Sequence, residues 1–262
     1  MKSRTSLLAM LLIALALGFC NLVAADDPIK PKETIKLFNG KDFTGLYTFL
    51  KKTGKEDPNK VFTVADGMIH VSGADNGYIA TKNEYADYHL SVEFKWGKEV
   101  FGSKYVRNSG VLLHMTGEDK VWPASFECQL AQGCVGDIIL IGGTKDRTMT
   151  AEIEVGPDKR PRWKEGGESK TWPPMKGQLW WNKHEPFFKE LIDTRGKDDV
   201  ESKLGDWTKV ECLCVGDTIT LKINGHTVNQ ITKVKPAAGK ILLQSEGFEM
   251  WFRNWELKPV KQ

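Results

Sequence analysis

The sequence has no large excess of either charge and no established catalytic signature. It carries 37 basic and 34 acidic residues, and this balance gives no electrostatic reason to expect a nucleic acid or an anionic membrane as a partner. The serine-hydrolase GxSxG, the zinc-protease HExxH, a phosphate-binding glycine loop and the EF-hand loop are all missing. Internal repeats and low-complexity tracts are missing too. These absences leave strand patterns and the placement of polar side chains as the guides to function.

Long apolar runs are lacking except near the start of the chain. There Lys2 and Arg4 precede an apolar run over Leu7–Phe19, and small residues follow at 23–25. A basic start, a short apolar run and a small-residue site form the pattern of an export signal. The run is too short for a membrane span. We therefore predict cleavage after Ala25.

Removal of that signal would leave 35 basic against 34 acidic residues in a chain of 237. A β domain of this size is commonly a single unit, so we predict one domain over residues 26–262, secreted or periplasmic. The alternative is a lipid anchor on Cys20, which is disfavoured because Phe19 is bulky where a lipoprotein signal has a small residue. The oligomeric state does not follow from the sequence.

Few cysteines remain after the predicted cleavage, and their pairing stays open. Cys212 and Cys214 lie two residues apart in a strand-like segment, so they share one face, and a bond between them would strain the strand. A zinc site on this pair is disfavoured because no second pair or nearby histidine completes four ligands. Free buried thiols and a cross-strand disulfide both remain open for the four residues, Cys128, Cys134, Cys212 and Cys214.

Helical periodicity is scarce, whereas short β-type runs recur between Gly, Asn and Asp turns. Asp66-Gly67 and Asn224-Gly225 each separate two alternating runs and predict two-residue hairpins. Many short strands of this kind predict an all-β protein, an antiparallel β-sandwich or jelly roll. Residues 156–206 break the pattern, because Pro, Gly, Lys and Trp dominate there. Their aromatic content argues against disorder, so we expect an ordered insertion laid over the sheet.

Polar side chains gather in the stretch over residues 108–143. Strand alternation places apolar residues on one face of two neighbouring segments and His114, Glu127 and Gln129 on the other. A sheet with one apolar and one polar face has an open side that is available to a ligand. Asp137 follows in the next turn. A solvated strand face with no function is the alternative interpretation.

The sequence contains nine tryptophans, a large number for its length. An aromatic ring packs on the apolar face of a sugar while amides and carboxylates bond its hydroxyls, so carbohydrate recognition suits this composition. Trp122, Trp180 and Trp181 are the candidates for a ligand wall. The strand tryptophans are expected to belong to the core, namely Trp96, Trp207, Trp251 and Trp255.

Three motifs carry a family resemblance. LFNGKDFTGLYTF, NSGVLLH with FECQL, and ILLQSEGFEMWFRNWELKPV occur in this order, and over residues 34–260 the chain resembles the 3-keto-disaccharide hydrolase domain family. The resemblance implies a concanavalin-like jelly roll, as in lectins and glucanases, in proteins that are mostly exported. It also implies cleavage of glycosides whose sugar has been oxidised to a ketone at C3.

That chemistry would explain a departure from glucanases, which place two carboxylates two residues apart on one strand, where this chain has Glu127 and then Gln129. A C3 ketone acidifies the C2 proton, so one base can start an elimination that water addition completes. The resemblance makes Glu127 or His114 the base, and Arg253 or a bound divalent metal the group that stabilises the enolate. The residues expected to orient the sugar are Asn108, Gln129, Gln244 and Glu246.

Other interpretations remain beside the enzyme. Arg253 could instead stack between Trp251 and Trp255 in a purely structural role. The same fold could serve a non-catalytic carbohydrate-binding module, because sandwiches of this type host both lectins and hydrolases. A structural cell-envelope protein whose sheet face binds another protein is a third hypothesis. A carbohydrate is the predicted partner in the first two.

Overall fold

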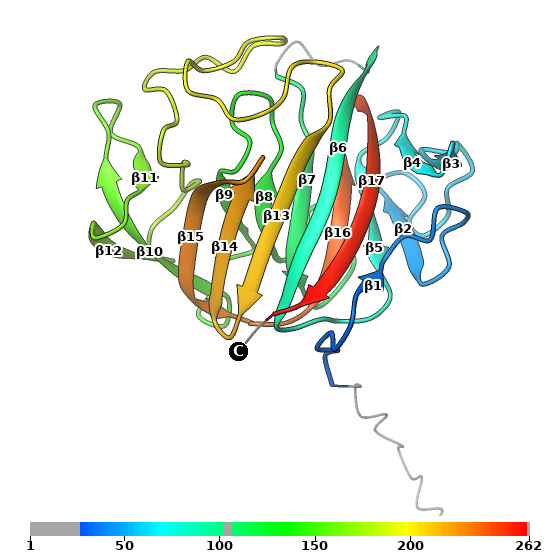
Figure 1. Ribbon diagram of the computed structural model, residues 1–262, viewed down its shortest axis with the longest axis horizontal. Helices are drawn as coiled ribbons and strands as arrows, with labels where there is room; N and C mark the ends of the chain where they lie inside the picture. Colours follow the sequence, from blue (N-terminus) through cyan, green and yellow to red (C-terminus); the bar gives the residue numbers. More distant parts are fainter. Residues whose placement is uncertain (1–26, 102–105, 261–262) are drawn as a thin grey trace, which may run out of the picture.

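A computed structural model describes residues 27–101 and 106–260. Within these ranges the chain forms strands only (Figure 1), so no described helix could cross a membrane. The predicted export signal lies outside the described residues. The strands are β1 Ile35–Lys36, β2 Leu46–Leu50, β3 Phe62–Ala65, β4 Met68–Val71, β5 Gly77–Thr81, β6 Tyr88–Val100, β7 Gly110–Met115, β8 Ser125–Gln129, β9 Ile138–Ile141, β10 Thr148–Val155, β11 Pro161–Trp163, β12 Glu168–Trp172, β13 Thr208–Val215, β14 Thr218–Ile223, β15 His226–Lys235, β16 Lys240–Ser245 and β17 Phe248–Pro259.

Two antiparallel sheets pack face to face. The eleven-stranded sheet has the order β11-β10-β15-β14-β13-β6-β17-β4-β3, with β1 beside β17 and β12 beside β10. The six-stranded sheet has the order β2-β5-β16-β7-β8-β9. Figure 1 shows the large sheet in front of the smaller one. The predicted antiparallel β-sandwich is confirmed.

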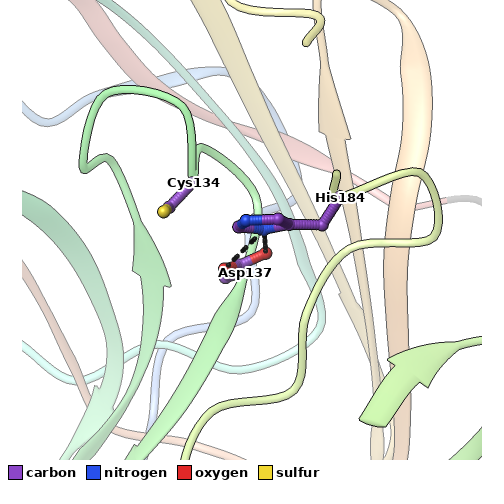
Figure 2. Close-up of side chains that lie close together, drawn as sticks. All are labelled: Cys134, Asp137 and His184. Carbon is purple, nitrogen blue, oxygen red and sulfur yellow. Dashed lines mark hydrogen bonds and ion pairs between the residues drawn. The ribbon is translucent and has the colours of Figure 1, made fainter. Parts of the chain in front are cut away.

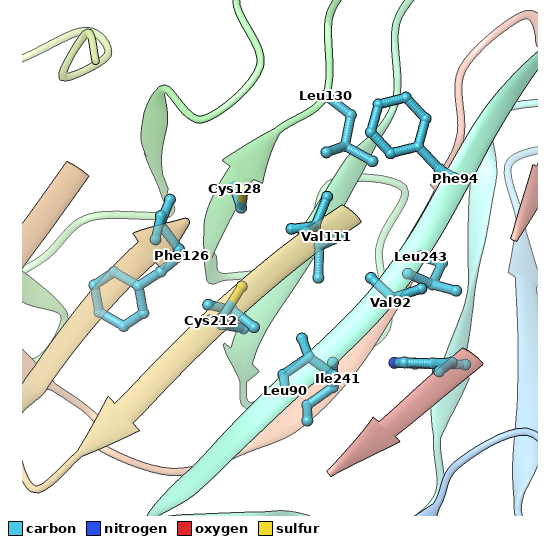
Figure 3. Packing of buried hydrophobic residues seen from close by; sticks show 14 of the residues in the cluster. Leu90, Val92, Phe94, Val111, Phe126, Cys128, Leu130, Cys212, Ile241 and Leu243 are labelled. Carbon is cyan, nitrogen blue, oxygen red and sulfur yellow. The ribbon is translucent and has the colours of Figure 1, made fainter. Parts of the chain in front are cut away.

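The core lies between the sheets because each inner face carries every second residue of its strands. In β13 the buried positions alternate, and Cys212 and Cys214 both point inward, as their spacing predicted. Cys212 from the large sheet and Cys128 from the small one enter the same apolar layer (Figure 3). All four described cysteines are buried free thiols, so the free-thiol alternative describes this structure.

Two-residue turns set the register of the hairpins. Asp66 and Gly67 connect β3 to β4 with φ of 52° and 73°, and Asn224 and Gly225 connect β14 to β15 with φ of 48° and 84°. Two consecutive positive φ values define the turn that matches strand twist, and Asn, Asp and Gly tolerate it best. Both predicted hairpins are confirmed.

The insertion over residues 156–206 is ordered, as its composition predicted, but it does not simply lie over a sheet. Its first part forms β11 and β12, which pair with β10 at the edge of the large sheet. The remainder runs to β13 without further strands and buries Trp180 and Trp181. This part is anchored on the turn between β8 and β9, which follows the predicted site strand.

Candidate functional site

The face of the six-stranded sheet that points away from the core carries a separate cluster, called the outer face below. Val111 and Leu113 of β7 belong to the main core, whereas Leu112 belongs to this second cluster. Glu127 pairs directly with Leu112 across β7 and β8, so its side chain is on the outer face. The parity that the sequence predicted for Glu127 is therefore correct. The apolar part of the outer face consists of Tyr78, Ala80, Leu112, Met115 and Leu242, with Tyr47, Phe49 and Ile141 at its margin.

Glu127 and Gln244 converge over Gly110. A Cβ placed on Gly110 would lie 2.3 Å from an oxygen of Glu127 and 2.4 Å from Oε1 of Gln244. Glycine is thus required at this position for the two side chains to meet. Glu127 as a residue is 4% exposed. Burial, and secondarily the nearby Glu246, raise the pKa of Glu127 well above its usual range, so the proton is held firmly.

Glu246 supplies a second carboxyl group to this site from the segment after β16. Burial raises the pKa of Glu246, while a hydrogen bond donated by Trp122 Nε1 at 2.6 Å lowers it. Trp122 itself is 49% exposed, so its hydrogen bond connects the buried carboxyl of Glu246 with the protein surface. The sequence placed both residues among sugar contacts but did not predict that Glu246 would neighbour Glu127. Two carboxyl groups in different environments are a common arrangement for proton transfer.

Unpaired amide atoms surround the carboxyl pair. Within the described ranges both Nε2 and Oε1 of Gln244 are buried and make no hydrogen bond, and Oδ1 of Asn108 is in the same state. Asn108 lies two positions before Gly110, just outside β7. Buried polar atoms are nearly always paired in folded proteins, and a bound ligand is one explanation for an exception. These atoms suit the hydroxyl and carbonyl groups of a sugar.

A tyrosine and aspartate group adjoins this site on the outer face, where Tyr78 of β5 pairs directly with Gln244 of β16. The hydroxyls of Tyr47 and Tyr78 each donate to Asp119 Oδ1 at 2.7 Å, and Lys55 Nζ lies 3.2 Å from its Oδ2. Burial acts to raise the pKa of Asp119, but these three donors outweigh it and leave the pKa lowered. Sequence reasoning missed this group because its members come from four separate segments.

His114 does not face Glu127, so the predicted common face is wrong for this residue. A β-bulge interrupts the pairing of β7 with β16 between Leu112 and Met115, and His114 has a φ of 52°. The extra residue turns the imidazole inward, where it packs edge-on against Tyr88 of the opposite sheet. Its Nδ1 lies 3.1 Å from the carbonyl oxygen of Pro236.

The inward His114 predicts a pH effect on stability. Burial lowers the pKa of His114 to about 4 from 6.5. A histidine with a depressed folded-state pKa contributes stability above its unfolded pKa, and that contribution is lost as pH falls from 6.5 toward 4. We expect the loss to be about 3 kcal/mol. Urea unfolding of the wild type and His114→Gln across this window checks it, because the difference between the two should shrink on acidification.

Arg253 is also remote from Glu127. It lies on β17 of the large sheet, between the core residue Phe252 and Asn254. Its Nε donates to Glu93 at 2.5 Å, and its guanidinium stacks 4.0 Å from the ring centre of Trp207. Arg253 therefore points out of the sandwich on the side opposite the outer face, so the predicted convergence with Glu127 is wrong. Arg253 does stack on a tryptophan, as the alternative interpretation stated, but the partner is Trp207 rather than Trp251 and Trp255.

Three further predicted sugar contacts are enclosed within the protein. Asp137 is fully buried and accepts hydrogen bonds from Trp181 N at 2.7 Å and Gln178 Nε2 at 2.9 Å. Trp180 and Trp181 are each 2% exposed, and Trp180 packs beneath the guanidinium of Arg160 at 4.1 Å. A ring that is already covered on this scale has no free face for a sugar. Their predicted role as a ligand wall has no support in this geometry.

Gln129 stays on the outer face side of β8, but its amide is already engaged. Its Oε1 accepts a hydrogen bond from the backbone N–H of Ala131 at 2.9 Å, which closes the turn after the strand. The residue is 7% exposed. Its position two residues after Glu127 therefore serves the backbone, and the second carboxyl of the site comes from Glu246 instead. The catalytic and sugar-binding roles of all the predicted residues stay predictions.

Fold and site together define a concanavalin-like β-sandwich of the carbohydrate-active kind. The chain belongs to the family described as the 3-keto-alpha-glucoside-1,2-lyase-like domain, whose model matches residues 33–258. The resemblance deduced from the three motifs is thereby confirmed. A comparison with curated proteins finds no match.

Solved structures share the fold. Two crystal structures of proteins assigned as glycosyl hydrolases from Parabacteroides distasonis ATCC 8503 superpose with a TM-score of 0.52 each. They are 19% and 20% identical to this chain, cover 87% of it, and are themselves covered over 94% and 100% of their length. At this identity the likeness establishes the architecture.

Proposed function

We propose that the protein cleaves glycosides whose sugar carries a ketone at C3, by removal of the C2 proton, departure of the glycosidic oxygen and addition of water. The observation that carries the proposal is the carboxyl pair Glu127 and Glu246 beside the unpaired amide of Gln244. Family membership supports the same chemistry. Export remains a prediction from the residues before Ala25.

The two carboxyl groups suit different roles. Burial raises the pKa of Glu127 well above its ordinary range, and it raises the pKa of Glu246 against the opposing hydrogen bond from Trp122. The group with the more strongly raised pKa holds its proton more firmly and can carry it to the leaving oxygen. The other, whose charged form is favoured by the N–H of Trp122, can take the proton from C2. We assign Glu127 as the acid and Glu246 as the base.

The reaction then closes without an outside proton source. Glu246 gains the C2 proton as the C1–O bond breaks, and Glu127 gives its proton to the departing oxygen. Water next adds at C1 of the unsaturated ketone, losing a proton to Glu127 while Glu246 returns one to C2. The amide N–H of Gln244 can donate to the C3 oxygen, where negative charge develops. Gln244 thus takes the task that the sequence had given to Arg253 or a metal.

The deciding experiment compares a 3-keto-glucoside with its unoxidised parent in deuterated water. The expected result is cleavage of the keto sugar alone, with deuterium at C2 of the product, because the proton taken by Glu246 exchanges with solvent. Parallel reactions with a chelator test the predicted metal. Cleavage of the parent without C2 exchange would indicate ordinary glycoside hydrolysis. Binding of either sugar without turnover would favour the carbohydrate-binding module.

Replacing Trp122 by Phe is expected to shift the acid limb of the pH–rate profile to higher pH. The indole N–H lowers the pKa of Glu246, and phenylalanine keeps the ring but removes the donor. A base with a higher pKa becomes ionised only at higher pH, so activity at acidic pH falls. The measurement is kcat/KM for the keto sugar against pH. An unchanged acid limb would contradict the assignment of Glu246 as the base.

A further inference from the structure

A second group of reactive side chains lies away from the outer face, in the turn between β8 and β9. Cys134 and Asp137 are three residues apart in this turn, and His184 reaches them from the insertion (Figure 2). One donor atom from each of the three residues lies within 4.8 Å of the others. All three side chains are buried. No other group of this kind occurs in the described ranges.

The backbone of the turn explains why Cys134 and Asp137 share one side. The N–H of Cys134 bonds the carbonyl oxygen of Ala131 at 2.7 Å, and the N–H of Asp137 bonds the carbonyl oxygen of Cys134 at 3.1 Å. Gly136, with a φ of 96°, lies so close to Val228 that a Cβ would come within 2.6 Å of it. The turn is thus held tightly against β15, and the spacing of its two donor residues is fixed by packing.

One ring nitrogen of His184 has a partner in the protein and the other has none. Its Nδ1 lies 3.2 Å from Asp137 Oδ2, and its ring packs against Trp180 with centres 3.6 Å apart. Its Nε2 is buried and makes no hydrogen bond within the described ranges. When Nδ1 carries the proton toward Asp137, Nε2 holds an unpaired lone pair. A buried acceptor without a partner is costly, and a metal ion is one group that would satisfy it.

We infer that Cys134, Asp137 and His184 form a structural site for one divalent metal ion, zinc by ligand preference, which clamps the insertion to the turn between β8 and β9. Thiolate and imidazole are donors that zinc takes in proteins. The carboxylate of Asp137 already bonds Nδ1 of His184, so it would orient and strengthen the histidine ligand rather than bind the ion itself. Donors around a tetrahedral zinc lie roughly 3.5 Å apart, so the present spacing needs only a small closure.

The burial of the site favours a metal over a reactive cysteine. A thiol that is 1% exposed cannot meet a substrate from solution. A bound cation would make the thiolate favourable and would balance the buried charge of Asp137. The site is distinct from the carboxyl pair, so the inference does not depend on the proposed function.

Zinc titration of the chelator-treated chain, from residue 26 onward, tests the inference under reducing conditions. Binding of one zinc ion per chain is expected, with Tm raised by roughly 5–10 °C at about a hundred times the Kd. Cobalt provides a second readout, because a thiolate ligand adds a charge-transfer absorption band to the cobalt complex. No Tm change and no such band in the wild type would overturn the inference, whatever the variants do.

Matched variants identify the ligands. Cys134→Ser should abolish the cobalt–thiolate band, and His184→Gln should weaken zinc binding at least about tenfold. Cys214→Ala removes another buried thiol, remote in sequence and on the large sheet, and should leave the band and the zinc affinity unchanged. Where a variant fails to fold, the refolding yield of the wild type is compared with zinc and with chelator. A structural metal is bound as the chain folds, so zinc should raise this yield. Equal refolding yield in both conditions would count against the site.

Discussion

Replacing Glu127 by Gln is expected to lower kcat/KM for a 3-keto-glucoside by roughly 10²–10⁴-fold, the range contributed by a positioned general acid or base. Glutamine keeps the size of the side chain and its place beside Gln244 but cannot exchange a proton. The pKa of Glu127 is raised chiefly by burial, so a neutral amide suits the same environment, and Tm should not fall. The measurement is kcat/KM over a range of pH, with Tm recorded for each protein.

Glu246→Gln should produce a loss of similar size, because the base and the acid act in the same step. Residues that act as one unit are strongly non-additive, so the double variant should lose little more than the worse single variant. Strictly additive losses would mean that the two carboxyl groups work independently. Full activity in Glu127→Gln would remove the carboxyl pair as the reactive centre.

Arg253→Ala tests whether the active site lies on the outer face with Glu127 or includes Arg253, as the motif positions had predicted. Arg253 lies on the large sheet with Glu93 and Trp207, so its removal should leave kcat/KM unchanged. Both partners are only half-buried and can rehydrate, so the effect on Tm should be small. A loss as large as that of Glu127→Gln, with Tm intact, would contradict the location of the site on the outer face.

The sequence predicted those features that depend on local alternation and turn chemistry. Glu127 faces away from the core because strand parity is a property of the strand alone, and both hairpins follow from Asp-Gly and Asn-Gly. His114 escaped prediction because a single extra residue in β7 reverses parity beyond it. No feature of the sequence around His114 indicates that bulge.

The motifs did not predict which residues distant in sequence lie close together in space. Gln244 and Arg253 are close in sequence, yet β16 belongs to the six-stranded sheet and β17 to the eleven-stranded one. The chain crosses the sandwich between them, which carries Arg253 to the far side and leaves Glu246 near Glu127. Composition likewise did not predict how the insertion packs. Trp180 there is covered by Arg160 and Arg162 rather than by a ligand.

Removing the carboxylate of Asp158 is expected to cause the largest loss of stability. Arg162 donates to it through both terminal nitrogens at 2.8 and 2.9 Å, with side chains only 5% and 4% exposed. The guanidinium holds the pKa of Asp158 well below its usual range. This contribution is therefore present above the ordinary pKa of aspartate and lost as pH falls below it. Arg162 Nε also binds the carbonyl oxygen of His184 at 2.9 Å, so the pair anchors the insertion.

Asp158→Ala would leave Arg162 buried without its counter-charge, which costs about 3–5 kcal/mol and should lower Tm by roughly 6–20 °C. The double variant Asp158→Leu with Arg162→Met should recover most of this loss, because a buried ion pair replaced by apolar residues is often neutral. The matched control is Glu154→Ala, whose partner Lys164 is exposed and whose cost should stay within about 1 kcal/mol. Urea unfolding at neutral pH measures all three. A loss in Asp158→Ala no larger than in Glu154→Ala would mean that water reaches the freed guanidinium, and that the insertion is held by its apolar contacts instead.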